Sequence, residues 1–335
     1  MDNDFQSLIE QFVSLGGVAE NIRLSKGDLG RGIFPIDSSR RSKIMTPASL
    51  LISRNQIGVR HDEIYVKDSS KFSSKERSFI ELYYNYAWKD GGNVCAFEFL
   101  EYISTMPELV KNQLLGCGFI DKALSSGYPD ENAVLKRFID ERVVVFEGNS
   151  VVASVWDLVN HSSFATPLRI TPYGVETPPM EPHSGEILFK YSGKNSPMRM
   201  WNKYGFACEC IVAYSIPFSI KIGNQALAIR CAGRLGLDPK EKTSFSMDGD
   251  VLSIKLLPVG CLSNALPREN FKSILSSVGL SADVANRLFP KIREVNIKAR
   301  RDLIDSLQES GSGAKAQLYK ALMYEIELIE NSLID

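Results

Sequence analysis

The sequence predicts an α+β protein in which short β-strands alternate with helical blocks. Residues near the N-terminus and from about 142 to 220 are rich in β-branched side chains and turn residues, which is typical of short strands. Residues from about 48 to 140 and from 271 to 334 instead repeat apolar side chains at helical spacing. A chain of 335 residues is long enough to form one large domain or two domains of moderate size, and we expect two.

The N-terminal part is predicted to begin with a helix and to continue as strands. Apolar residues recur at helical spacing within residues 1–20, and Gly16 and Gly17 stop the pattern. The period then changes. Short strands are predicted at residues 22–24, 30–34 and 43–47, the first two around a turn at residues 26–28.

A helical insert is predicted from about residue 48 to residue 140, and strands return after it. Residues 142–156 surround the turn at 147–149, and the Pro-, Ser- and Gly-rich stretch 163–184 is predicted to be a loop holding a hairpin at 168–174. The last part predicts a strand pair and then helices, at residues 243–257, 271–280, 281–309 with a possible break at Pro290, and 314–334 after a break at 310–313. We therefore expect domains at 1–230 and 231–335.

Composition favours a cytoplasmic protein without an electrostatic preference for polyanions. The net charge is −1, with 39 basic and 40 acidic residues, so neither nucleic acid nor an anionic membrane surface is an expected partner. No signal peptide or apolar run of membrane-spanning length is visible. The six cysteines are scattered and read as reduced thiols. Cys208 and Cys210 lack nearby ligands to complete a zinc site, so we expect no metal.

Three stretches in a particular order resemble a known family. Residues 156–163 contain Asn160-His161-Ser162, residues 185–191 run from a Gly-Glu pair to Tyr191, and Tyr204-Gly205-Phe206 follows. This order and spacing resemble the SET-domain methyltransferases of the Rubisco large-subunit methyltransferase-like subgroup. The resemblance implies an SET fold of short β-sheets with a pseudoknot, the helical insert at about 48–140, and a mainly helical substrate-binding domain at 231–335.

The same resemblance implies S-adenosyl-L-methionine as the cofactor and suggests which residues bind it. Gly30, Arg31 and Gly32 match a glycine-rich turn that lets backbone approach the cofactor. Asn160 and His161 match the pair that holds its adenine and methionine portions. Without the resemblance, the first group reads as a plain β-turn and His161 as a satisfied core histidine.

Two further charged residues complete the expected cofactor site. Arg137 resembles the arginine that reaches the cofactor carboxylate, which suits the planar fork of a guanidinium, although Arg142 is a rival for this role. Asp157 is expected to brace the loop that carries Asn160.

Aromatic residues of the resemblance are expected to form the catalytic and acceptor part of the site. Tyr191 matches the catalytic tyrosine, whose phenol oxygen is expected to lie near the transferred methyl group of the cofactor and the attacking amine and to orient both. Tyr204 and Phe206 match the turn that lines the substrate channel, with Phe206 also stacking on the cofactor. The loop at 192–196 has the family's length, whereas residues 197–201 depart from its pattern, which affects substrate contacts more than chemistry.

The resulting hypothesis is a protein-lysine N-methyltransferase that acts on a protein substrate. A lysine amine must lose its proton before attack, and burial in an aromatic channel favours that loss. Two alternatives stay open: a protein-histidine methyltransferase, since the pocket would also accept an imidazole, and a non-catalytic SET-fold binding module. The sequence leaves the oligomeric state open, and a monomer is our working expectation.

Overall fold

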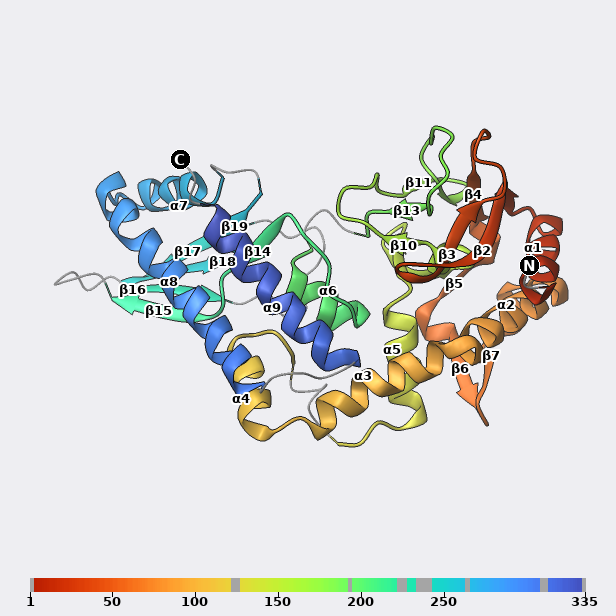
Figure 1. Ribbon diagram of the computed structural model, residues 1–335, viewed down its shortest axis with the longest axis horizontal. Helices are drawn as coiled ribbons and strands as arrows, with labels where there is room; N and C mark the ends of the chain where they lie inside the picture. Colours follow the sequence, from red (N-terminus) through yellow and green to blue (C-terminus); the bar gives the residue numbers. More distant parts are fainter. Residues whose placement is uncertain are drawn as a thin grey trace. The chain divides into compact units, whose positions relative to one another are not determined.

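The computed structural model describes residues 3–121, 127–191, 195–221, 228–232, 243–262, 266–307 and 313–332. Within these ranges the chain folds into small sheets and helices (Figure 1), which confirms the predicted α+β class. No helix in the same ranges combines the length and the apolar character needed to cross a membrane.

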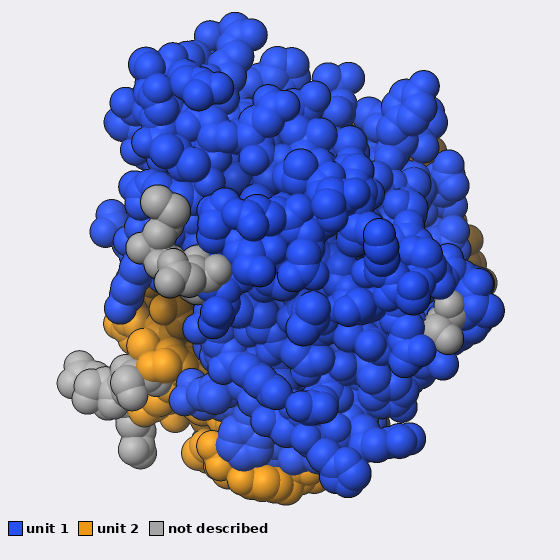
Figure 2. Space-filling view, turned by 90° about the vertical axis from the view of Figure 1, so that its right-hand side faces the viewer, with its two compact units in different colours: residues 1–98, 129–193 blue, residues 99–128, 194–335 orange. Residues whose placement is uncertain are grey.

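Contacts along the chain define two compact units, each built from two separate segments (Figure 2). Unit 1 comprises residues 1–98 and 129–193, and unit 2 comprises residues 99–128 and 194–335. This division differs in extent from the expected domains at 1–230 and 231–335, which stay a prediction.

Unit 1 is built mainly from short strands. They are β1 (Val18–Glu20), β2 (Ile22–Gly27), β3 (Gly30–Pro35), β4 (Lys43–Pro47), β5 (Leu51–Ser53), β6 (Ile57–Arg60), β7 (Glu63–Val66), β8 (Val143–Phe146), β9 (Asn149–Ala153), β10 (Asn160–His161), β11 (Arg169–Thr171), β12 (Gly174–Glu176) and β13 (Leu188–Phe189). The sheets have the orders β1-β4-β12-β11 and β5-β9-β8, with the hairpins β2-β3 and β6-β7 and the parallel pair β10-β13. The hairpins predicted around residues 26–28, 147–149 and 168–174 are confirmed.

The expectation that the chain is helical from about residue 48 is wrong for its first part. Strands β5, β6 and β7 occupy residues 51–66 before the first helix of that block begins. Ile57 and Val59, and then Ile64 and Val66, recur at the strand period of two. His61 and Asp62 between them both have positive φ, at 52° and 59°. Positive φ at both central residues is the geometry of a tight hairpin turn, which Gly or Asn usually signals. The turn residues here are His61 and Asp62, so the sequence lacks the signal that usually indicates a hairpin.

Helices cover the strands of unit 1. They are α1 (Asn3–Ser14), α2 (Ser74–Ala87), α5 (Glu131–Asp140) and the start of α3 (Asn93–Thr105), and a kinked helical stretch, η4 (Trp88–Gly92), joins α2 to α3. Helix α2 begins at a capping box in which Ser73 accepts from the Glu76 amide and the Glu76 carboxylate accepts from the Ser73 amide. Phe79 of α2 packs on Phe12 of α1, with ring centroids 5.9 Å apart, which closes the core on that side.

Unit 2 packs helices on one face of a sheet. Its helices are α4 (Glu108–Gly116), α6 (Pro197–Tyr204), α7 (Leu266–Ser277), α8 (Ala282–Ser306) and α9 (Gly313–Asn331), and its strands are β14 (Val212–Tyr214), β15 (Phe218–Lys221), β16 (Ala228–Ala232), β17 (Ser244–Asp248), β18 (Val251–Lys255) and β19 (Pro258–Cys261). One sheet has the order β15-β16-β18-β17 and the other pairs β14 with β19. Buried Ile229, Leu252 and Ile254 of the larger sheet pack with residues of α7, α8 and α9 in one core.

The C-terminal expectations hold with one exception. The strand pair predicted at 243–257 corresponds to β17 and β18. Pro290, however, lies inside α8, which continues through the expected break. A proline inside a helix removes one hydrogen bond but is tolerated where packing fixes the helix, and buried Leu288, Phe289 and Ile292 do so here. Of the break predicted at 310–313, residues 310–312 lie outside the described residues.

Candidate functional site

Three motif-bearing segments of unit 1 are joined by backbone hydrogen bonds. Strand β10 pairs in parallel with β13, so that Asn160 lies opposite Leu188 and His161 opposite Phe189. The amide of Ile187 donates to the carbonyl of Ile33 in β3 at 2.8 Å. The Asn-His strand, the Gly-Glu segment and the glycine-rich hairpin therefore lie side by side, although they are far apart in the sequence.

The side chain of Asn160 ties these segments together. Its Nδ2 donates both to the Arg31 carbonyl oxygen at 2.9 Å and to Glu186 Oε1 at 2.6 Å. A Cβ atom on Gly32 would lie 1.9 Å from Glu186 Oε1 and 2.8 Å from Asn160 Nδ2. Gly32 thus has no side chain because the carboxylate and the amide fill that space, whereas Gly30 is needed for the turn conformation, with φ of 93°.

Glu186 is a candidate site residue that the sequence analysis did not select. Loss of hydration raises the pKa of its carboxyl group, and the nearby charge of Asp28 raises it further, while the hydrogen bond from Asn160 acts in the opposite direction. The carboxylate would be favoured by a cationic group placed beside it. Its position in the Gly-Glu pair of residues 185–191 was the signal that could have identified it.

His161 is held in one tautomer by two hydrogen bonds. Its Nδ1 accepts from the backbone amide of Tyr191 at 3.0 Å, so Nδ1 carries no hydrogen. Nε2 therefore carries the hydrogen and donates to Ser163 Oγ at 3.1 Å. The buried imidazole fixes the backbone at Tyr191 rather than acting as an exposed base, so its observed contacts are those of a structural histidine.

Tyr191 lies in an aromatic cluster beside β10. Its ring centroid is 4.8 Å from that of His161 and 4.8 Å from that of Phe189. The hydroxyl donates to the backbone carbonyl of Val159 at 3.0 Å. Because its hydrogen is used in this way, the phenol oxygen can act only as an acceptor toward any further group.

Asp157 has a bracing geometry. It lies in the short helical turn η5 (Trp156–Leu158), its side chain is fully buried, and it accepts a hydrogen bond from the Tyr83 hydroxyl. Arg142 Nε is 3.3 Å from Asp157 Oδ2. Burial raises the pKa of Asp157, and the Arg142 charge opposes that shift. The turn before Asn160 is thereby anchored to α2 and to the segment after α5.

The two candidate arginines have protein partners. Arg137, buried at the end of α5, forms an ion pair with Glu141 through Nε and Oε1 at 2.6 Å. Arg142 contacts Asp157 and stacks over the Phe138 ring, with 3.8 Å from Cζ to the centroid. Burial lowers the pKa of Arg137, and Glu141 opposes this. The carboxylate that Arg137 contacts is thus that of Glu141, a residue of the protein itself.

The Arg31 side chain contacts η4 and α2. Its guanidinium forms an ion pair with Asp90 in η4 and lies over the Tyr86 ring, 5.4 Å from Cζ to the centroid. The backbone carbonyl of Arg31, rather than its side chain, takes part in the Asn160 contact.

Tyr204 and Phe206 belong to unit 2. Tyr204 ends α6, Gly205 caps the helix with a φ of 78°, and the two rings have centroids 6.1 Å apart. Residues 197–201, which depart from the family pattern, form the body of α6. Of the loop predicted at 192–196, residues 192–194 lie outside the described residues.

A metal centre is not visible in the described part of the chain. Within the ranges given above, no group of three or more His, Cys, Asp or Glu side chains is placed to hold an ion. Cys208 Sγ and Cys210 Sγ are 3.7 Å apart.

Comparisons with known proteins gave structural matches alone. No protein-family model and no curated protein matches the sequence. Among solved structures, the SET domain of LSMT bound to lysine and AdoHcy is 14% identical, with 99% of this chain and 90% of that chain covered and a TM-score of 0.45. The same domain bound to MeLysine and AdoHcy is 13% identical (98% and 90% covered, TM-score 0.47), and Rubisco LSMT bound to AdoMet is 15% identical (99% and 91% covered, TM-score 0.44).

Proposed function

We propose that this protein is an S-adenosyl-L-methionine-dependent protein-lysine N-methyltransferase. The observation that carries the proposal is the junction of Gly32, Asn160 and Glu186, beside which the amide of Tyr191 is bonded to His161. These three segments are far apart in the sequence, and burial of apolar side chains alone does not require their polar residues to meet. Their meeting around polar side chains supports one binding site.

The residues at the junction fit the chemistry of this cofactor. S-adenosyl-L-methionine supplies an electrophilic methyl group on a positively charged sulfonium and also carries an ammonium group. Glu186 offers a carboxylate whose pKa is raised by loss of hydration, and a cationic group placed beside it would favour the ionised form. The side-chain amide of Asn160 donates its hydrogens to the Arg31 carbonyl and to Glu186. Its oxygen Oδ1 can therefore accept a hydrogen bond from an amine of the cofactor. Arg137 remains our candidate for the cofactor carboxylate and would exchange Glu141 for it.

The catalytic role falls to Tyr191, which would orient the acceptor nitrogen. In-line transfer needs the nitrogen held opposite the sulfonium and shielded from water. The phenol oxygen is fixed by Val159 and can accept a hydrogen bond from the attacking amine. Asp157 and His161 hold this region rigid. Tyr204 and Phe206 are assigned to the wall of the acceptor channel on the motif alone, with Phe206 stacking on the cofactor.

The acceptor is proposed to be a lysine of a folded protein. Its ammonium group must release a proton before the nitrogen attacks, and an apolar aromatic surrounding favours the neutral amine. A histidine acceptor would use the same residues, and fragmentation mass spectrometry of the methylated product distinguishes the two. We further propose a cytoplasmic location and a monomer, with neither nucleic acid nor membrane as a partner.

Calorimetric titration with S-adenosyl-L-methionine tests the cofactor site first. We expect micromolar binding that is lost in Asn160→Ala, because that change removes both contacts of the amide. Asn112→Ala, at an exposed position of α4, is the matched control and should bind like the wild type. Absence of binding to the wild-type protein would contradict the proposal.

Transfer of labelled methyl groups in a cell extract tests the reaction. We expect one or more labelled proteins with the wild type and loss of label with Tyr191→Phe, while cofactor binding is retained. Tyr173→Phe, on an exposed tyrosine, should leave labelling intact. Cofactor binding without labelling of any protein would favour the non-catalytic SET-fold module instead.

A further inference from the structure

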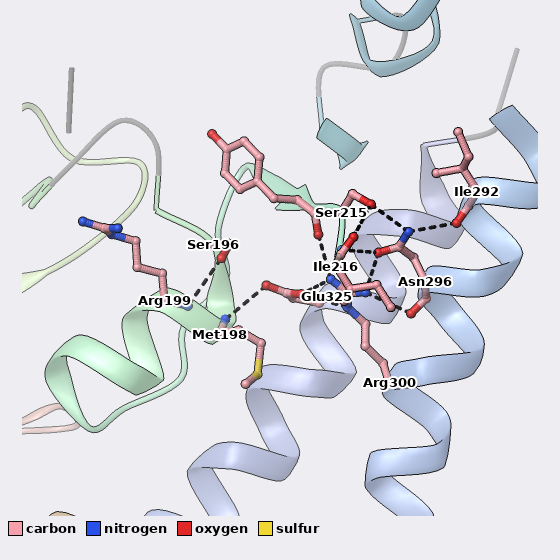
Figure 3. A network of polar contacts seen from close by, with 10 residues as sticks. Ser196, Met198, Arg199, Ser215, Ile216, Ile292, Asn296, Arg300 and Glu325 are labelled. Atoms are coloured by element: carbon pink, nitrogen blue, oxygen red, sulfur yellow. Dashed lines mark hydrogen bonds and ion pairs between the residues drawn. The ribbon is translucent and has the colours of Figure 1, made fainter. Parts of the chain in front are cut away.

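Helix α9 holds both ends of helix α6. At the start of α6 the amide of Met198 donates to Glu325 Oε1 at 3.3 Å (Figure 3). Near its end the indole Nε1 of Trp201 donates to the Ala314 carbonyl at 3.1 Å. All of these residues belong to unit 2, so the contacts lie within one compact body.

A third contact reaches the aromatic turn itself. The amide of Ala207, the residue after Phe206, donates to Gln317 Oε1 at 2.8 Å. Along α9, residues 314 and 317 therefore contact the end of α6 and residue 325 contacts its beginning. The two helices run antiparallel, and Figure 1 shows them side by side.

The carboxylate at the start of α6 is fixed by a buried network. Arg300 Nε donates to Glu325 Oε2 at 2.8 Å, and both side chains are almost completely buried, at 0% and 1% exposure (Figure 3). Arg300 also donates to Asn296 Oδ1 at 3.0 Å and to the Tyr214 carbonyl at 2.9 Å. Because Oε2 is engaged by the guanidinium, Oε1 points to the amides of α6, where the helix dipole favours an anion.

Helix α6 needs such external contacts. It has eight residues, and helices of that length are marginal without tertiary packing. Its own caps are Ser196, whose Oγ accepts from the Arg199 amide at 3.3 Å, and Gly205. The contacts from α9 add one fixed point at each end, so they determine where the turn after α6 lies relative to α9.

We propose that Gln317 and Glu325 of α9 are positioning residues for the aromatic turn formed by Tyr204 and Phe206. The inference rests on the proposed function, in which these two rings line the acceptor channel. Gln317 acts on the turn directly through Ala207, and Glu325 acts from the opposite end of α6. Neither side chain touches the reacting atoms, so loss of either should weaken capture of the protein substrate. Cofactor binding should weaken less, because Phe206 alone of the two rings is assigned to the cofactor.

The test compares Gln317→Leu with Gln317→Glu. Leucine removes the acceptor for the Ala207 amide at similar volume, whereas glutamate retains an oxygen in that place. We expect Gln317→Leu to raise KM for the labelled substrate protein about tenfold or more, as small displacements of a binding wall do. The dissociation constant for S-adenosyl-L-methionine should rise by a smaller factor than KM, because only Phe206 of the turn is assigned to the cofactor. Gln317→Glu should restore KM to near the wild-type value.

Hydrogen exchange of residues 196–207 provides a readout that does not depend on activity. We expect faster deuterium uptake there in Gln317→Leu and in Glu325→Gln, and wild-type uptake in Gln317→Glu and in Glu327→Gln, an exposed position of the same helix. Unchanged uptake, or a wild-type KM in Gln317→Leu, would overturn the inference. If the wild type transfers no methyl group, the proposed function fails, and uptake alone then decides whether α9 fixes the turn.

Discussion

The residues that meet at Asn160 differ in how far the sequence alone predicts their roles. Gly32, Asn160 and His161 could be selected from motif order alone. Glu186 also stands in the Gly-Glu pair of the motif, but its contact with Gly32 could not be predicted, because the space that Gly32 leaves exists only after three segments meet. Local sequence carries no information on such long-range complementarity.

Gly32→Ala is predicted to destabilise unit 1 and to weaken cofactor binding. The added Cβ would meet Glu186 Oε1 at 1.9 Å, so the carboxylate must leave Asn160, and overpacking of this kind costs about 1–3 kcal/mol. Urea denaturation and calorimetry measure the two effects. Gly116→Ala, at an open exposed position in α4, is the control and should be neutral or slightly stabilising. Equal behaviour of the two variants would contradict the steric argument.

The ion-pair partners of Arg137 and Arg142 show a second limit of prediction from the sequence. Both Arg137 and Arg142 were compatible with the sequence pattern near the Asn-His strand. The structure pairs Arg137 with Glu141, four residues further on, which helical spacing alone permits. It pairs Arg142 with Asp157 in a separate segment, and that partner depends on how α5 packs, so periodicity cannot give it.

Elements were predictable wherever their period was regular and their turns carried the usual residues. The β2–β3 and β8–β9 hairpins have glycine-containing turns and were found, whereas the β6–β7 hairpin turns at His61 and Asp62 and was missed. Helix α8 was expected to break at Pro290, but its buried face continues on both sides of the proline. Packing therefore outweighed the local proline signal in α8, whereas the β6–β7 turn lacks the residues that usually signal a hairpin.

Replacement of Pro290 by alanine is predicted to stabilise α8. The proline is exposed and lies within the helix, so alanine restores a backbone donor and removes the ring without disturbing the core. Interior proline costs up to about 3 kcal/mol relative to alanine, and we expect a gain of roughly 1–3 kcal/mol in the free energy of unfolding. Glu294→Ala, also exposed in α8, serves as the control and should change it by less than about 0.5 kcal/mol. A destabilised Pro290→Ala protein would mean that α8 requires a proline bend.

The buried pair of Arg300 and Glu325 is predicted to be strongly coupled. Arg300→Met leaves the Glu325 carboxylate buried without its cation and should cost about 3–5 kcal/mol in urea denaturation. The double variant Arg300→Met, Glu325→Leu should recover most of that loss, because neither charge then remains buried. Additive effects of the two single changes would refute the coupling.

At the scale of the whole molecule, buried phenols make stability depend on alkaline pH. Burial, followed by the charge of Asp157, raises the pKa of Tyr83 and Tyr84 well above the usual 10.0. Burial also raises the pKa of Tyr102 to about 12. A raised pKa in the folded state means that the full contribution to stability is present below pH 10 and is lost as pH rises from 10 through the folded-state pKa.

The free energy of unfolding should therefore fall by about 1.4 kcal/mol per pH unit above pH 10 for each such tyrosine. Urea denaturation at a series of pH values from 9 to 11 measures this slope. Tyr84→Phe should reduce the slope by about 1.4 kcal/mol per unit, because one phenol no longer titrates in the unfolded state. A slope unaffected by this change would show that Tyr84 ionises equally in both states.

The chain leaves and re-enters each compact unit, since it passes between them after residues 98, 128 and 193. During synthesis the ribosome thus releases residues 99–128 before either unit has all its parts. Unit 1 can be completed only once residue 193 has emerged, and unit 2 must wait for the C-terminal helices. A chain truncated after residue 193 would hold all of unit 1 but only residues 99–128 of unit 2, so the order of translation allows the first unit to be completed before the second.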